Sequence, residues 1–118
     1  MSFTRSLTAP QQDFVDIMGR STLPLMAAPM FLVSGPELVI ACARAGIIGS
    51  YPAANARNVD ILREWMAHTR DAIQADRPGA PWSLNMIVHS SYDRFDAELA
   101  LVQEFQPKIV STALGSPR

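Results

Sequence analysis

The feature that most constrains the fold is a regular alternation of short apolar runs with longer amphipathic segments. The short runs are rich in apolar residues and predict strands; they cover residues 24–28, 47–48, 82–88 and 108–114. Segments with helical periodicity separate them, at 34–46, 59–75 and 92–105, and a short helical segment at 10–20 precedes the first run. Strands that alternate with helices pair in parallel through crossover connections. The sequence therefore predicts an α/β fold of the form βαβαβαβ after a short N-terminal helix.

Local signals mark the ends of the predicted helices. Ser34 and Glu37 have the spacing of a capping box, with Ser34 as the N-cap of the first crossover helix. Gly46 is the residue expected just past the end of that helix. Asn58 is a good N-cap for the longest helix, residues 59–75. Asp93, Asp96 and Glu98 with Arg94 are typical of a charged, solvated helix face.

The ends of the predicted strands are unusually poor in large side chains. Two architectures fit the pattern, an open doubly wound sheet and part of a (β/α)8 barrel, and both bind ligands at the carboxyl ends of the strands. We call these ends, with the loops that follow them, the carboxyl edge. It gathers Ala28, Pro29, Met30, Gly49, Ser50, Asn85, Ser111 and Thr112, with Tyr51 expected as aromatic cover. Small residues and one amide suit a planar heterocycle with polar edges.

Composition argues against several classes of function. The net charge is −1 and the Lys and Arg residues are scattered, so the sequence predicts no binding to nucleic acid or to a membrane surface. No apolar run approaches the ~20 residues of a membrane span, and the N-terminus lacks a signal-peptide core, which together predict a cytoplasmic protein. Cys42 is the only cysteine. It lies on the apolar helix face and is expected to be a core residue.

Five motifs in a fixed order resemble a known family. They are Ala-Pro-Met at 28–30, Pro-Glu-Leu at 36–38, Ala-Gly-x-x-Gly at 45–49, Asn85 within an apolar strand, and Ser-Thr-x-x-Gly at 111–115. In this order they resemble the opening of the nitronate monooxygenases (2-nitropropane dioxygenases), which are FMN-dependent TIM barrels. The resemblance implies that residues 23–118 form the first half of a barrel, and the helical periodicity at 10–20 makes residues 1–22 a helical lead-in.

The resemblance also implies a set of residues that contact the flavin. They are Ala28, Pro29, Met30, Gly49, Asn85 and Ser111. The backbone of 28–30 would lie against the ring, Asn85 would bond it, Gly49 would line its pocket and Ser111 would lie in a neighbouring turn. A complete barrel needs ~250 residues. The family's catalytic histidine and its glycine-rich phosphate loops fall beyond residue 118, so no catalytic residue is assigned, and His89 does not match the family's position.

The implied activity is that of an oxidoreductase with FMN as cofactor and a small nitronate as substrate. A monooxygenase of this kind converts an alkyl nitronate into a carbonyl compound and nitrite. Two alternatives stay open: a flavin-dependent enoyl-acyl-carrier-protein reductase, which shares this opening, and a non-catalytic half-barrel that needs a partner chain. Half a barrel would leave the first and fourth strands unpaired, which favours self-association through the edges of the sheet.

Overall fold

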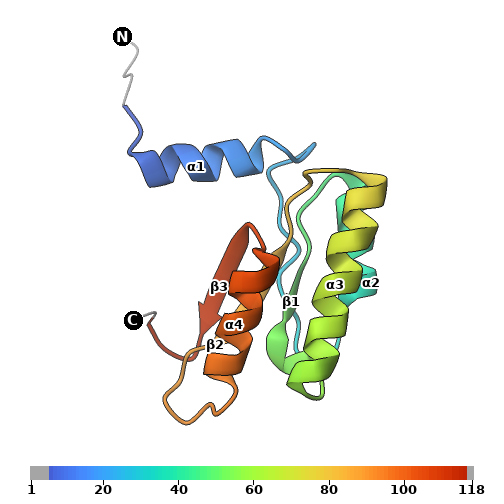
Figure 1. The fold of residues 1–118 in the computed structure, drawn as a ribbon. Helices are drawn as coiled ribbons and strands as arrows, with labels where there is room; N and C mark the ends of the chain where they lie inside the picture. Colours follow the sequence, from blue (N-terminus) through green and yellow to red (C-terminus); the bar gives the residue numbers. More distant parts are fainter. Residues whose placement is uncertain (1–5, 117–118) are drawn as a thin grey trace.

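The computed structural model describes residues 6–116, and these form a layer of helices against a small sheet (Figure 1). The elements in chain order are α1 (Ala9–Met18), α2 (Pro36–Ala45), β1 (Ser50–Pro52), η1 (Ala53–Asn55), α3 (Val59–Asp76), β2 (Ser83–Ile87), α4 (Phe95–Phe105) and β3 (Ile109–Ala113). Residues 1–5 of the predicted lead-in and residues 117–118 of the predicted half-barrel lie outside the described residues.

The sheet confirms the predicted class and corrects the number of strands. Its order is β1-β2-β3 and both pairings are parallel, as an α/β fold requires. The first predicted strand, residues 24–28, is reduced to a single parallel bridge between Met26 and Ile48. Its backbone bonds are Ala27 N–H to the Ile48 carbonyl (2.8 Å) and Ile48 N–H to the Leu25 carbonyl (2.9 Å). Prolines at 24 and 29 supply no N–H, which shortens the pairing.

The second predicted strand is displaced along the chain. The pattern predicts a strand at 47–48 that Gly49 ends, but β1 begins at Ser50 and continues to Pro52. The Gly49 carbonyl accepts a 2.9 Å bond from Ser83 N–H, so this glycine still pairs with the start of β2. A glycine therefore lies within the paired segment, and the strand continues beyond it.

Two of the three predicted helix ends are confirmed. Gly46 ends α2 in the left-handed conformation, with φ 85°. Asn58 caps α3, and its side chain accepts a 2.9 Å bond from Ile61 N–H. The predicted capping box at Ser34 is wrong, because the N-cap of α2 is Gly35 and makes no side-chain bond. The Ser34 hydroxyl is used elsewhere, in the loop before the helix.

The core lies between the sheet and the helices α2, α3 and α4. Tyr51 and Leu84, neighbours in register on β1 and β2, are both completely buried and pack with residues of α3 and α4 such as Leu62 and Leu101. Because side chains alternate along a strand, Ser50 and Ser83, which precede Tyr51 and Leu84, face the opposite side of the sheet. Figure 1 shows α1 across the end of the sheet where the strands begin, and every residue of α1 is at least partly exposed.

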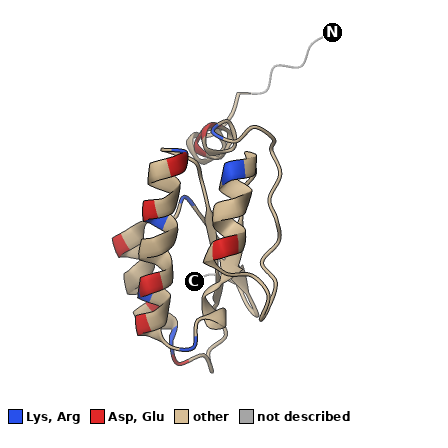
Figure 2. Ribbon diagram, turned by 90° about the vertical axis from the view of Figure 1, so that its right-hand side faces the viewer, with Lys and Arg blue, Asp and Glu red and all other residues tan. Residues whose placement is uncertain are grey.

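Charged residues of both signs occur on α2 and α3, whereas the charged residues of α1 and α4 are all acidic (Figure 2). Across residues 6–116, no helix is both long enough and apolar enough to cross a membrane.

Candidate functional site

Asn85 and Ser111 form a polar pair on neighbouring strands. They are register partners on β2 and β3, and the Asn85 Nδ2 donates a 3.0 Å hydrogen bond to Ser111 Oγ. Pro52, the last residue of β1, is the register partner of Asn85 on its other side. All three therefore lie in one row on the face of the sheet away from the helices. The structure brings together two of the six predicted site residues.

A second polar row lies next to the first on the same face. Ser50 and Ser83 are register partners on β1 and β2, and both are completely buried. Neither Oγ has a hydrogen-bond partner among the described residues. Buried hydroxyls are normally paired, since an unsatisfied one costs about 1–3 kcal/mol. The face opposite the helices is thus polar along two strands, and sequence reasoning did not single out Ser83.

The loop after the first predicted strand is held by Asn55, which the sequence analysis missed. The Asn55 Nδ2 donates to the carbonyls of Met30 (3.0 Å) and Ser34 (2.8 Å), and its Oδ1 accepts from Leu32 N–H (2.9 Å). The Ser34 Oγ accepts from Met30 N–H at 2.9 Å. The predicted residue Pro29, half-buried, immediately precedes this loop. The sequence signal that could have pointed to this role is the position of Asn55, three residues after the end of β1.

The fixed loop carries four consecutive exposed apolar residues. Met30 is 45% exposed, and Phe31, Leu32 and Val33 are 68–78% exposed. Leu32 adopts a positive φ of 62°, a conformation that a branched side chain rarely takes without support from its surroundings. Ala28 is exposed as well. Exposed apolar clusters of this kind are typical of surfaces that a ligand or another chain covers.

Gly49 lies elsewhere, although the sequence places it at the carboxyl edge. It precedes β1 and is buried against α2. A Cβ built on Gly49 would lie 2.6 Å from Val39 Cα and 3.1 Å from Cys42 Cβ. Its side-chain direction therefore points into the helix layer, on the opposite face from Ser50. Close approach of helix and strand explains this glycine.

Tyr51 also points into the helix layer and does not cover the carboxyl edge. Its ring is completely buried, edge-on to Trp65 (centroids 5.6 Å apart) and stacked with Trp82 (5.9 Å). Its hydroxyl lies 3.4 Å from Thr69 Oγ1. Burial raises the pKa of this phenol far above its usual range, so Tyr51 stays neutral. Its role is in the core.

A buried carboxylate forms the centre of a polar cluster at the start of α4. Glu98 is completely buried, and the Tyr92 hydroxyl lies 2.9 and 2.8 Å from its two oxygens. Arg94 Nε lies 3.8 Å from Glu98 Oε2. Burial raises the pKa of Glu98, and the Tyr92 hydrogen bond and the Arg94 charge oppose that shift. The predicted solvated face is therefore wrong for Glu98, because the preceding loop folds back over it.

His89 and Cys42 differ in accessibility. His89 is exposed, and its Nδ1 accepts from Ser91 N–H at 3.2 Å and lies 2.7 Å from Ser91 Oγ. Because a backbone donor points at Nδ1, the neutral ring carries its proton on Nε2. Cys42 is buried as predicted, and burial raises the pKa of its thiol. A buried thiol without an activating cation is a poor nucleophile.

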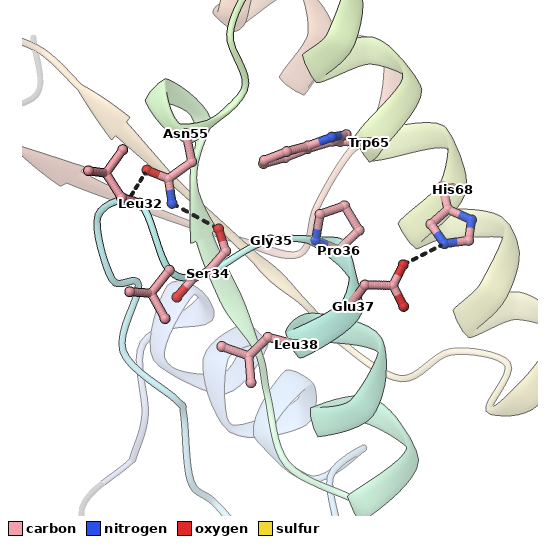
Figure 3. A pocket seen from close by; sticks show the side chains of 10 residues that line it. Leu32, Ser34, Gly35, Pro36, Glu37, Leu38, Asn55, Trp65 and His68 are labelled. Carbon is pink, nitrogen blue, oxygen red and sulfur yellow. Dashed lines mark hydrogen bonds and ion pairs between the residues drawn. The ribbon is translucent and has the colours of Figure 1, made fainter.

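Two cavities are lined by other residues than the six predicted ones. The first, about 600 Å³, lies between the start of α2 and the middle of α3 (Figure 3). Trp65 forms one wall, and Glu37 pairs with His68 at 3.5 Å. The second, about 680 Å³, lies between α4 and β3 and includes His89. Within the described part of the chain, no group of three His, Cys, Asp or Glu residues could hold a metal ion.

The protein is thus a parallel α/β protein, and its candidate site is an asparagine–serine pair on the face of the sheet away from the helices. Neither a protein-family model nor a curated protein matches the chain. The resemblance to nitronate monooxygenases rests on the residue pattern alone.

Proposed function

We propose that this chain is the ring-binding half of a flavin-dependent oxidoreductase that resembles the nitronate monooxygenases and is built on a (β/α)8 barrel. The observation that carries the proposal is the Asn85–Ser111 pair, which lies on adjacent parallel strands and faces away from the helices. Parallel strands with helices on one side match one wall of such a barrel, whose interior side chains lie on the other face.

The residues present fit the ring of a flavin. Within residues 6–116, the bond found for the Asn85 side chain uses its Nδ2, so Oδ1 is available to accept from a ring N–H. The backbone of residues 28–30 leads into the Met30–Ser34 loop that Asn55 fixes, and Ala28 and Met30 are exposed, so a planar ring can approach this backbone closely. Gly49 is removed from the proposed contacts because it faces α2. Ala28, Pro29, Met30, Asn85 and Ser111 remain.

The phosphate of FMN has no comparable support. The glycine-rich loops that the resemblance implies for it do not occur in residues 1–118. Each charge-assisted hydrogen bond contributes ~1.5–3 kcal/mol, so the absence of several lowers affinity by orders of magnitude. We therefore expect weak flavin binding by this chain alone, dominated by contacts to the ring, with similar affinities for riboflavin and FMN.

The proposed reaction divides the work between the flavin and the chain. A bound flavin would supply the redox chemistry, accepting electrons from the nitronate and passing them to dioxygen. Overall, two nitronates and one dioxygen would give two carbonyl compounds and two nitrites, with one atom of dioxygen in each carbonyl group. Asn85 would hold the polar edge of the ring, and the 28–30 backbone would lie against its face. No residue of this chain is assigned as the base.

The test is to purify the chain with added FMN and to record the flavin spectrum and nitrite release from an alkyl nitronate. A red-shifted or quenched flavin signal that Asn85→Ala removes, but Asn58→Ala retains, would support the proposal. Asn58 is a matched control because it caps α3 and lies outside the polar rows. Reduction of an enoyl thioester by NADH would favour the reductase instead. No flavin signal at millimolar FMN would refute both.

A half-barrel that needs a partner chain is the second candidate, and the free side of β3 favours it. β3 lies at the edge of the sheet, and its residue Val110 is 38% exposed on the face that helices cover elsewhere. Leu99 of α4 is 36% exposed, and it lines the cavity between α4 and β3 together with Val110. Light scattering tests this: a dimer supports a paired half-barrel, and a monomer at millimolar concentration contradicts it.

A further inference from the structure

Three loops that follow successive strands are joined by one chain of hydrogen bonds. Arg94, just before α4, donates from Nη1 to the Ala56 carbonyl (2.9 Å) and from Nη2 to the Ala53 carbonyl (3.4 Å). These two carbonyls bracket the η1 turn, which presents Asn55. Asn55 in turn bonds the carbonyls of Met30 and Ser34 and the amide of Leu32. The loop after β2 is thereby connected to the loop before α2.

The contacts of Arg94 separate two roles for its guanidinium. Its Nε is 3.8 Å from Glu98, beyond hydrogen-bonding distance, whereas Nη1 makes a 2.9 Å bond to a backbone carbonyl. Glu98 already receives the Tyr92 hydroxyl. The hydrogen bonds of the Arg94 guanidinium are therefore to the η1 turn. The Glu98 carboxylate attracts the guanidinium by its charge, at a longer distance. The Arg94 side chain is 21% exposed, so these bonds are largely shielded from water.

We propose that Arg94, acting through Asn55, is a positioning residue that fixes the Met30–Ser34 loop. The inference rests on the proposed function in one respect only: that loop adjoins the backbone expected to lie against the flavin. The hydrogen bonds found for Arg94 within residues 6–116 go to the η1 turn and not to the loop or the proposed ring contacts. Arg94 holds the η1 turn, the turn fixes the orientation of the Asn55 amide, and the amide sets the loop.

The experiment is amide hydrogen exchange of the whole chain, read at Leu32 and Ala56. Ala56 N–H donates to the Ala53 carbonyl and so reports on the η1 turn. Leu32 N–H donates to Asn55 Oδ1 and so reports on the contact between Asn55 and the loop. In Arg94→Gln we expect both amides to exchange about tenfold faster, as the loss of a charge-assisted bond implies. Arg63→Gln is the control, because Arg63 also loses an ion pair in that variant, an exposed one between α3 and Glu104 of α4.

A double variant distinguishes positioning from simple charge compensation. Arg94→Gln leaves the buried Glu98 carboxylate without its cation and could unfold the chain, whereas Arg94→Gln/Glu98→Gln removes both charges and keeps an acceptor for Tyr92. We expect the double variant to regain the unfolding midpoint of the native chain while Leu32 still exchanges about tenfold faster. Recovery of native exchange at Leu32 would overturn the proposal, because Arg94 would then be only a counter-ion of Glu98.

Flavin binding gives a second readout that keeps the two proposals apart. Where the native chain binds FMN, the double variant should bind it about tenfold more weakly at equal stability. Unchanged flavin affinity together with fast Leu32 exchange would overturn the link between the loop and the ring. Where the native chain binds no FMN, the proposed function fails, yet the exchange result still decides whether Arg94 positions the loop.

Discussion

Gly49→Ala tests whether this glycine serves the packing of α2 or the proposed ring site. The added Cβ would lie 2.6 Å from Val39 Cα, 3.1 Å from Cys42 Cβ and 3.2 Å from Val39 Cβ. The nearest obstacle is backbone, so a side-chain rotation cannot relieve it and α2 must move away from the strand. Overpacking of a filled core costs ~1–3 kcal/mol, and a backbone contact places this variant near the upper value.

We therefore expect Gly49→Ala to lower the free energy of unfolding by about 3 kcal/mol, a large part of the ~5–15 kcal/mol that stabilises a typical domain. With a slope of about 1.5 kcal/mol per molar urea, the midpoint falls by about 2 M. The assay is urea unfolding followed by circular dichroism, without flavin.

Gly79→Ala is the matched control for this experiment. Gly79 has a φ of 83°, and nothing lies within 4 Å of a Cβ built on it. That variant bears only the backbone strain of a left-handed residue, ~1–2 kcal/mol. A Gly49→Ala chain as stable as the native protein would refute the close contact with α2. It would also reopen a role for Gly49 at the ring.

Three further predictions follow from single groups. Because burial raises the pKa of Glu98 above its ordinary value of 4.5, the folded state holds that proton more tightly than the unfolded chain does. The free energy of unfolding should thus fall as pH rises from 4.5 through the raised pKa, and urea titrations at pH 4–8 should show that Glu98→Gln removes this fall. Asn58→Ala should cost ~1 kcal/mol by the same assay, since Ile61 N–H loses its cap, and an unchanged midpoint would contradict it. Cys42 should react with a thiol reagent only in urea, and rapid labelling of the folded chain would contradict its burial.

Features set by local sequence could be predicted, and those set by distant contacts could not. Gly46 and Asn58 mark helix ends through bonds within a few residues, so their roles are readable in the sequence. The first strand depends on neighbours far along the chain, and only the Met26–Ile48 bridge of it forms. Ser34 had two competing local uses, and its hydroxyl bonds Met30 N–H instead of the helix end.

The candidate site shows the same division. Asn85 stood out as an amide within an apolar strand, and Ser111 as a small residue in the Ser-Thr-x-x-Gly motif; the register of β2 and β3 makes them partners. Gly49 and Tyr51 were misplaced because the direction of a side chain depends on the register, and one residue of slip reverses the face. Asn55 escaped notice because its three bonds reach 21–25 residues back along the chain.

The most direct measurement is an NMR titration of the isotope-labelled chain with riboflavin and FMN. A ring seat at the asparagine–serine pair predicts shifts of the Asn85 side-chain amide and of the Met30 and Ser111 backbone amides, with the Trp82 indole unchanged. Trp82 is buried and stacks on Tyr51 in the helix layer, so it serves as the internal control. An unperturbed Asn85 amide at millimolar flavin, including the case of shifts confined to the cavity that Trp65 lines, would contradict the proposed seat.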